Sequence, residues 1–388
     1  MRTVDAAGLD IGDDSPPRIM GVLNVSQESP YDPSVFADPG EAATYVDEMI
    51  SEGADIVDIG LESANKRFEV LSAEGELDRL DTAVAAMEST GGDAVFSIET
   101  RYHEVAEAAL ERGFDMVNDI CGFADPEMPR VCAEYDVAVS KMASPPDIER
   151  PGAIEDVDDI YAALGRNGLT EKTLLDPAFG GWSEAKTLAD DRETFRRLRE
   201  FRAIGHPILV SINRKNFLRD IAGRSTEEAL PASLAATAMA VERGAHVIRT
   251  HDVAETRDAV LVGDRFTRDR TVETVGTVRV EEHDVTTPGE AQRHIDRVRS
   301  GPPEPGTTGD DPERGGGAAA VSRVYTVSGL DATARHRLQR LAADHDVFVT
   351  GGNSADRELL LAGSVASLRE LAAAAEEPPE LHAALAVI

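Results

Sequence analysis

The sequence predicts an α/β fold, a (β/α)8 TIM barrel with a small C-terminal α/β appendage after a flexible linker. Two observations predict the barrel: short apolar runs recur eight times in the first 265 residues, and stretches with helical periodicity separate them. A third is that every run ends on a polar residue, as expected where strand ends carry the chemistry of a barrel. The predicted strands are residues 19–24, 54–58, 94–99, 116–119, 137–141, 173–176, 208–214 and 247–251.

The barrel pattern spans residues 18–265, and helix signals mark its connections. Ser225 and Glu228 form a capping box ahead of a helix over residues 229–243, and Gly244 ends that helix. Small residues at 233–238 within this helix allow close packing. The simpler expectation is packing on the barrel itself, and the alternative is packing against a second subunit.

The remaining segments differ in composition. Residues 1–17 are polar and predict a short lead-in, and residues 266–300 form a charged extension of undefined structure. Residues 301–320 are rich in Gly and Pro, cannot build a core and predict a linker. Residues 321–388 predict a small β-α-β-β-α module of unknown role, for which packing or partner binding is the default. Its elements are expected at 321–327, 332–343, 347–350, 358–361 and 364–374.

The charge of the chain excludes several classes of partner. The formal net charge is -33, with 72 acidic and 39 basic residues. Such a surface repels nucleic acid and anionic membranes, so neither is an expected partner. It suits a halophilic protein, because high salt screens the self-repulsion. No apolar run reaches the roughly 18 residues that span a bilayer. Cys121 and Cys132 show no disulfide or zinc spacing, which favours reduced thiols and a cytoplasmic location.

Two carboxylates and an amide end three of the predicted strands. They are Glu99, Asn118 and Asp176, and the barrel geometry turns them toward one mouth. Carboxylates accept paired N–H donors in a bidentate fashion, so the set suits the edge of a guanidine-like heterocycle. The alternative is that each side chain satisfies only its local backbone.

Cations and a histidine follow the last two strands. Arg249 and His251 share one face of a strand because side chains alternate, and both predict an anion pocket for a leaving group. Lys215 leaves the seventh strand beside Asn213, Arg214 and Asn216, and Phe217 adds an apolar face. Barrels commonly bind phosphate near strands seven and eight.

Other polar residues lie at the remaining strand ends. Asn24 opens a long loop and could ligate a metal or an oxyanion, or simply cap the strand. Lys66 and Arg67 follow the second strand and could hold a phosphate, or be ordinary exposed charges. Lys141 could reach the mouth from the fifth strand, although a solvated lysine is equally compatible.

Six short motifs taken together resemble the dihydropteroate synthase family. They are MGVLNVS at 20–26, GADIVDIG at 53–60 followed by Glu62 and Ser63, VNDI at 117–120, LDP at 175–177, NRK at 213–215 and RTHDV at 249–253. Each motif is weak alone, but their order matches the family across residues 18–260. The resemblance does not extend to the C-terminal tail.

The resemblance implies a transferase of folate synthesis. The reaction joins 4-aminobenzoate to 6-hydroxymethyl-7,8-dihydropterin diphosphate and releases diphosphate, with Mg2+ as cofactor and a homodimer as the assembly. By carry-over, Glu99, Asn118, Asp176 and Lys215 would hold the pterin. Asn24, Arg249 and His251 would hold the diphosphate, and Asn24 its metal; Lys66 and Arg67 could assist. Lys215, Arg249 and His251 would be the catalytic set.

The chain departs from the family pattern at several positions. Glu99 stands where the family has Asp, and residues 64–66 replace its Thr-Arg-Pro. Residues 28–32 replace an Asp-Ser-Phe-Ser-Asp pattern, Ala178 replaces a Gly, and the segment to Lys186 is longer. These changes leave the acceptor amine open.

Two other functions stay open at this stage. One is a pterin-dependent methyltransferase, which would not need the anion pocket of Arg249 and His251. The other is a non-catalytic pterin-binding protein whose C-terminal module binds a partner.

Overall fold

The computed structural model divides the chain into two compact units. One unit is Met1–Asp269, and the other begins at Arg270. The structure describes residues 1–25, 34–36, 38–62, 70–148, 152, 154–180, 185–275, 278–300, 316–327, 329–351, 359–375, 382 and 385.

The first unit is built on a closed ring of eight parallel strands. The ring order is β8-β7-β6-β5-β4-β3-β10-β9, and a bridge between Leu175 and Ile208 joins its two ends. The strands are β3 (Arg18–Asn24), β4 (Ile56–Gly60), β5 (Val95–Thr100), β6 (Met116–Asp119), β7 (Ala138–Met142), β8 (Thr173–Asp176), β9 (Leu209–Val210) and β10 (Val247–Thr250). The predicted TIM barrel is confirmed, and β9 is shorter than its predicted run.

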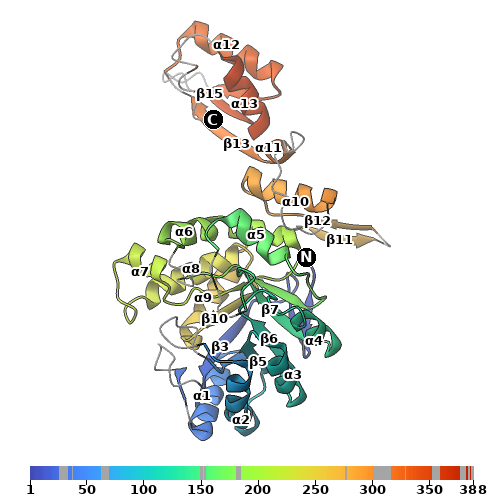
Figure 1. Cartoon of the computed structure of the whole chain (residues 1–388). Coiled ribbons are helices and arrows are strands. Elements are labelled where there is room, and N and C mark those ends of the chain that lie inside the picture. The colour runs from blue at the N-terminus through green and yellow to red at the C-terminus, as the bar shows by residue number, and fades with distance from the viewer. Residues whose placement is uncertain are drawn as a thin grey trace. The chain divides into compact units, whose positions relative to one another are not determined.

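Helices surround the ring, as Figure 1 shows. They are α1 (Pro39–Glu52), α2 (Ala73–Ser89), α3 (His103–Glu111), α4 (Met128–Glu134), α5 (Val157–Gly165), α6 (Leu188–Arg196), α7 (Asn216–Ala222), α8 (Leu230–Glu242) and α9 (Val253–Phe266), with a 3-10 helix at Leu198–Ile204. Side-chain caps define several starts: Asp38 accepts from Gly40 and Glu41, and Thr187 forms a capping box with Asp190.

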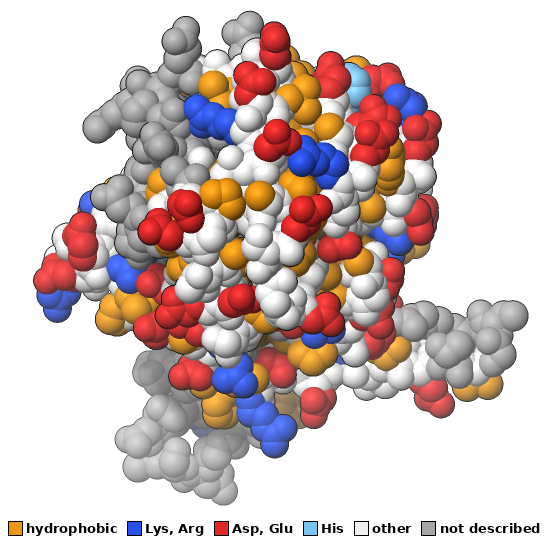
Figure 2. All heavy atoms as spheres, turned by 90° about the horizontal axis from the view of Figure 1, so that it is seen from below, with side chains coloured by type: hydrophobic (Ala, Val, Ile, Leu, Met, Phe, Trp, Pro, Cys, Tyr) orange, Lys and Arg blue, Asp and Glu red, His pale blue; other side chains and the backbone are white. Residues whose placement is uncertain are grey.

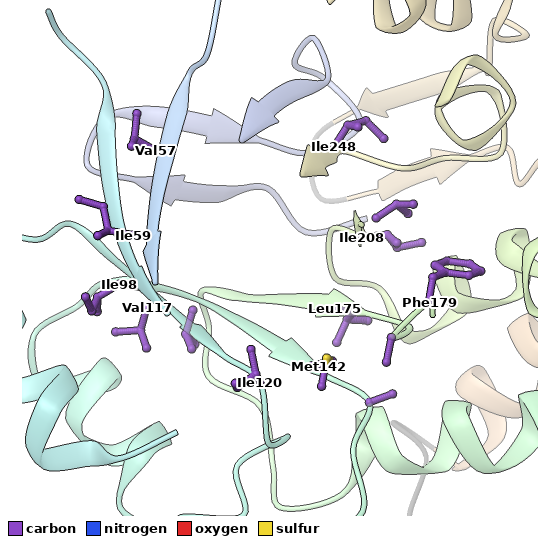
Figure 3. Close-up of a cluster of buried hydrophobic side chains, with 14 of the residues drawn as sticks. Val57, Ile59, Ile98, Val117, Ile120, Met142, Leu175, Phe179, Ile208 and Ile248 are labelled. Atoms are coloured by element: carbon purple, nitrogen blue, oxygen red, sulfur yellow. The ribbon is translucent and has the colours of Figure 1, made fainter. Parts of the chain in front are cut away.

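Alternation along the strands separates the two faces of the ring. Val57, Ile59, Ile98 and Val117 belong to one large apolar cluster with the helices (Figure 3). Their neighbours in sequence face the barrel interior. Because the period is two, the interior positions at the C-terminal ends include Asp58, Glu99, Asn118 and Arg249.

The N-terminal segment is part of the barrel, so the predicted polar lead-in over residues 1–17 is wrong. β1 (Val4–Ala6) and β2 (Leu9–Ile11) form an antiparallel hairpin, turning at Ala7 and Gly8 with positive φ values of 51° and 91°. Val4, Ala6 and Ile11 share a buried cluster with the first inward residues of the strands. The hairpin therefore closes the N-terminal end of the barrel. The chemistry belongs at the other end.

The small residues 233–238 pack on the barrel's own helix α9. A Cβ placed on Gly263 of α9 would lie 2.6 Å from the carbonyl oxygen of Ala238. Ser233, Ala236 and Thr237 are buried. The structure therefore confirms the simpler expectation, that these small residues pack on the barrel itself. The capping box of Ser225 and Glu228 is present, in the turn that precedes α8.

The second unit combines two segments that the sequence treated as separate. The 266–300 extension contains β11 (Val272–Val275), β12 (Val278–Glu281) and α10 (Pro288–Ser300). The part of the predicted linker at 301–315 lies outside the described residues, and its end is a short helix, α11 (Gly316–Ala320). Gln292 of α10 accepts a hydrogen bond from the Gly317 amide of α11 at 3.0 Å, and Ala291 of α10 shares a buried cluster with Val321 and Val365 of the module.

The C-terminal module has the predicted β-α-β-β-α order. Its elements are β13 (Ser322–Val327), α12 (Ala332–Asp344), β14 (Phe348–Gly351), β15 (Leu359–Ser364) and α13 (Val365–Ala374). The sheet order is β13-β15-β14, and all neighbours are antiparallel. Leu338 and Leu368 pack with Leu359 and Leu361 in its core.

Acidic side chains dominate the face of the molecule shown in Figure 2. They lie among scattered apolar and fewer basic side chains. None of the described helices is long and apolar enough to cross a membrane.

Candidate active site

Asp58 is the hub of a polar cluster inside the C-terminal end of the barrel. Its side chain is 0% exposed. Its Oδ2 accepts from Arg249 Nε at 2.8 Å and from Asn118 Nδ2 at 2.9 Å, and its Oδ1 accepts from Ser97 Oγ at 2.8 Å. Four strands, β4, β5, β6 and β10, thus contribute to one hydrogen-bonded group.

Glu99 joins this cluster through Arg249. Arg249 Nη2 donates to Glu99 Oε2 at 2.6 Å, so one guanidinium spans two carboxylates. Burial raises the pKa of Glu99, and Arg249 opposes that rise. Burial disfavours the charge on Arg249, but Glu99 and Asp58 outweigh it and raise the pKa of Arg249. Arg249 is therefore cationic throughout the physiological range.

Lys215, at the N-cap of α7, and Asp176, at the end of β8, face the same cluster. Burial lowers the pKa of Lys215, and Arg249 lowers it further, while Asp176 and Glu99 oppose the shift. Burial raises the pKa of Asp176, against the backbone hydrogen bond from Ala178 and the charge of Lys215. A Cβ on Gly180 would lie 2.9 Å from Lys215 Cδ, so only glycine leaves room for this lysine.

Ala178, where the resemblance leads one to expect a glycine, adopts a left-handed backbone with φ of 61°. Its amide donates to Asp176 Oδ1 at 2.8 Å, and its carbonyl accepts from Lys186 Nζ at 2.9 Å. Lys186 also pairs with Asp191 at 3.2 Å. These contacts hold the start of the β8–α6 connection and orient the carboxylate of Asp176.

His251 extends the β10 side of the cluster but is neutral. Burial, with Arg249 and Lys215 nearby, lowers the pKa of His251 to about 3. In the predicted anion pocket of Arg249 and His251, the histidine therefore carries no charge at neutral pH. His251 offers a hydrogen bond, and the positive charge comes from Arg249 and Lys215.

Asn24 lies beside the carboxylate of Glu99. Its Nδ2 donates to Ser34 Oγ at 3.1 Å, so its Oδ1 is the atom directed elsewhere. A Cβ on Gly60 would lie 2.9 Å from Asn24 Oδ1 and 3.8 Å from Glu99 Oε1. Two oxygen donors thus approach the space above Gly60. Lys66 and Arg67, the other predicted phosphate ligands, lie outside the described residues.

Lys141 is structural, so both expectations for it are wrong. It is 0% exposed, and its ammonium donates to the carbonyls of Leu164 and Gly168, each at 3.0 Å, and of Arg166. The register pairs it with Asp119 on the outer face of the barrel. The alternation that turns Met142 beside Asp176 turns Lys141 toward the end of α5.

Replacing Lys141 with methionine is expected to destabilise the fold and spare the chemistry. Three buried carbonyls at the end of α5 would lose their donor, at about 1–3 kcal/mol each at most. We expect the thermal midpoint to fall, with kcat/KM per folded molecule unchanged within about twofold. Calorimetry and a steady-state assay below the midpoint measure the two quantities. A tenfold loss of kcat/KM at an unchanged midpoint would contradict this assignment.

Other residues of the 213–217 segment also lie outside the polar cluster. Arg214 forms a two-pronged pair with Asp252, with both N–O distances at 2.8 Å, and Asn213 donates to the same carboxylate. Phe217 stacks on Phe179 with ring centroids 5.9 Å apart and is 1% exposed. The expected apolar face for a ligand is therefore core, and Lys215 alone of this segment reaches the cluster.

One other group in the described part of the chain has metal-type ligands: His103, Glu104 and Asp125. Asp125 Oδ2 accepts both the backbone amide and Nδ1 of His103, at 3.0 and 2.7 Å. His103 is the first residue of α3, whose N-cap Tyr102 makes no side-chain cap. Asp125, in the connection that follows β6, therefore caps the N-terminus of α3, and this capping accounts for the group.

Comparison with known proteins identifies the family. Residues 20–251 match the pterin binding enzymes. A dihydropteroate synthase of Streptococcus pyogenes is 33% identical over 252 residues, which cover 63% of this chain and 93% of that protein. The chain belongs to the dihydropteroate synthase family.

Solved dihydropteroate synthases share the barrel. The Thermus thermophilus enzyme in complex with 4-aminobenzoate is 32% identical, covers 68% of this chain and 100% of its own, and has a TM-score of 0.56. The same enzyme has been solved with 6HMPPP, at a TM-score of 0.55. A probable bifunctional folylpolyglutamate synthase/dihydropteroate synthase of Halobacterium salinarum is 35% identical, but the matched region is 31% of that protein.

The structure brings together most of the predicted dihydropteroate synthase site. Glu99, Asn118, Asp176, Lys215, Arg249 and His251 converge at one end of the barrel. Sequence reasoning placed Asp58 among the polar strand ends without a specific role, and it missed Ser97 and Lys186. Asp58 ends an apolar run, and Ser97 precedes Glu99 by two residues, so inward alternation was the available signal for both.

Proposed function

We propose that the chain is a dihydropteroate synthase that binds a hydroxymethyl-dihydropterin diphosphate and transfers its methylene carbon to the amine of 4-aminobenzoate. One observation carries the proposal. Carboxylates able to hold a heterocycle, Glu99 and Asp176, lie in one cluster with the cations Lys215 and Arg249. A ring and the anion that it loses can therefore be bound side by side.

Asp176, Asn118 and Glu99 supply the acceptors for the ring. The pyrimidine edge of a pterin presents adjacent N–H donors, which a carboxylate accepts in pairs. Asn118 adds its side-chain oxygen, because its nitrogen is bonded to Asp58. Burial makes these contacts selective, since a ligand lacking the donors leaves the acceptors unpaired.

Arg249, Lys215 and His251 act on the departing diphosphate. Charge grows on the leaving oxygens as the methylene carbon separates, and preformed cations stabilise that charge. A diphosphate beside His251 would also raise its pKa and favour an additional donor. The incoming aromatic amine is a neutral nucleophile, so positioning is the main requirement.

The side-chain oxygen of Asn24 fits Mg2+, which prefers oxygen ligands and accepts few from the protein. We propose Asn24 as a ligand of the Mg2+ that accompanies the diphosphate. The ion would neutralise charge on the phosphate oxygens. Asn24 itself is held by Ser34, which fixes the direction of its side-chain oxygen.

Removing Mg2+ with a chelator is expected to stop diphosphate release, and added Mg2+ to restore it. Asn24→Ala should raise the Mg2+ concentration for half-maximal activity by about tenfold, the order expected for one lost metal contact. Ser51→Ala, at an exposed helix end, is the control. An unchanged Mg2+ requirement in Asn24→Ala would exclude Asn24 as a ligand.

The function is tested by mixing the chain with the pterin diphosphate and 4-aminobenzoate in molar salt and measuring diphosphate. Release that depends on the amine supports the synthase. Tight pterin binding without release would instead favour a binding protein. Methyl transfer from a reduced pterin would favour the methyltransferase alternative, which the cations at the mouth disfavour.

We also propose a homodimer that pairs the α8–α9 face. Met239 of α8 and Leu261, Val262 and Phe266 of α9 are exposed apolar side chains on two adjoining helices, and Phe266 is 79% exposed. Exposed apolar patches of this kind mark interfaces. Such a dimer leaves the barrel mouths open to substrate.

Phe266→Glu is expected to convert the dimer to monomers, because a buried unpaired charge costs several kcal/mol. Sedimentation in molar salt measures the mass. Val298→Glu, at an 87% exposed position of the second unit, is the control and should leave the mass unchanged. A dimeric Phe266→Glu chain would rule out this face.

A further inference from the structure

Asp58 has no role in the chemistry described so far, although its carboxylate accepts three hydrogen bonds within the site. Its carboxylate is fully buried, and Asp58 pairs in register with Ser97, one inward position before Glu99, so it lies deeper in the barrel than Glu99. A buried carboxylate is costly unless it is paired and hydrogen-bonded, and all three of its contacts are donors from other strands. A buried carboxylate of this kind fixes the orientation of the side chains that donate to it.

The first consequence concerns Asn118. An ionised carboxylate only accepts hydrogen bonds, so the nitrogen of the Asn118 amide must face Asp58 at 2.9 Å. The oxygen of the amide is then the atom available to a ligand. Without Asp58 the amide could turn by 180° and present donors where the ring also presents donors.

The second consequence concerns Arg249. Its Nε is held by Asp58 and its Nη2 by Glu99, which sets the plane of the guanidinium. A planar guanidinium recognises an anion with directional specificity only when its orientation is fixed. The same oxygen of Asp58 therefore orders both an acceptor for the ring and a cation for the leaving group.

We propose that Asp58 is the positioning residue of the site, which fixes the amide of Asn118 for pterin recognition and aligns Arg249. This inference rests on the proposed pterin chemistry. Asp58 does not touch the substrate, and it acts through the two residues that do.

An exchange of the two side chains tests the proposal. Asp58→Asn lets the Asn118 amide turn, and Asn118→Asp sets two carboxylates against each other. The double variant Asp58→Asn/Asn118→Asp restores an amide donor facing a carboxylate, with an oxygen still directed at the ring. We expect each single variant to weaken binding of the pterin diphosphate by about 30-fold or more, and the double variant to recover to within about fivefold of the unmodified chain.

The matched control is Asp119→Asn. Asp119 is also a fully buried aspartate at a strand end, but it lies on the outer face and accepts from the amides of Cys121 and Phe123. Its substitution should leave pterin affinity within about twofold. Thermal unfolding of every variant separates loss of fold from loss of binding. If Asp58→Asn does not fold, Asn118→Asp and the double variant still make the comparison.

The outcomes separate the two proposals. Recovery in the double variant supports the positioning role, because a purely structural loss at either position would accumulate. A double variant that binds no more tightly than Asn118→Asp overturns this inference alone. An unmodified chain that does not bind the pterin overturns the proposed function, and this inference with it.

Discussion

Replacing Arg249 with alanine is expected to lower kcat/KM by at least tenfold and on the order of 100-fold, the scale of losing one preorganised contact to developing charge. Arg249 is the cation that bridges the ring acceptor Glu99 and the hub Asp58. Steady-state diphosphate release at saturating Mg2+ measures the effect. Because the contact strengthens as the leaving group departs, kcat should fall along with kcat/KM.

The loss of Arg249 also leaves two buried carboxylates without their cation, which can destabilise the fold by about 3–5 kcal/mol. Arg249→Lys therefore accompanies the alanine variant, because it keeps the charge but cannot span both carboxylates. Arg197→Ala is the control: Arg197 also bridges two carboxylates, Glu200 and Asp158, on the outside of the barrel. Equal kcat/KM in Arg249→Ala and Arg197→Ala would remove Arg249 from the site.

Lys215→Ala should likewise lower kcat/KM by at least tenfold, and Lys215 should set the alkaline limit of activity. Burial lowers the pKa of Lys215 below its usual 10.5. A base with a lowered pKa keeps its proton only below that pKa. Activity that needs the ammonium is therefore full at lower pH and falls as pH rises through the lowered value.

The pH profile of kcat/KM distinguishes this role from a structural one. Lys215→Arg should move the alkaline limb upward, because a guanidinium stays protonated. Lys172→Ala is the control, since Lys172 lies at the opposite end of the barrel, where it donates to the carbonyl of Asp136. An alkaline limb that is identical in the Lys215→Arg and unmodified chains would assign the limit to another group.

Strand alternation explains how much of the site the sequence predicts. Apolar runs ending in polar residues locate the barrel mouth, and period two places Glu99, Asn118 and Arg249 on its inner face. The same rule, applied from Met142, would have turned Lys141 outward. The sequence alone left Lys141 between the barrel mouth and solvent, because the carbonyls that bind it come from the end of α5 and the residues after it.

Properties that depend on several elements at once could not be predicted. Burial, together with the cations Arg249 of β10 and Lys215 just before α7, lowers the pKa of His251 and removes its charge. Asp58 is a single acid at the end of an apolar run, and its contacts with Ser97, Asn118 and Arg249 appear only when four strands converge. The β1–β2 hairpin was missed because its strands have three residues each, although Val4, Ala6, Leu9 and Ile11 alternate around a turn at Gly8.

A crossed binding measurement tests the central claim, that acidic groups hold the ring while cations hold what it releases. Calorimetry would compare Asp176→Asn and Arg249→Ala, each titrated with the hydroxymethyl-dihydropterin alone and with Mg2+-diphosphate alone. We expect Asp176→Asn to weaken the pterin by about tenfold or more and to spare the diphosphate, and Arg249→Ala to do the reverse. Equal losses of both ligands in both variants would contradict the division of the site.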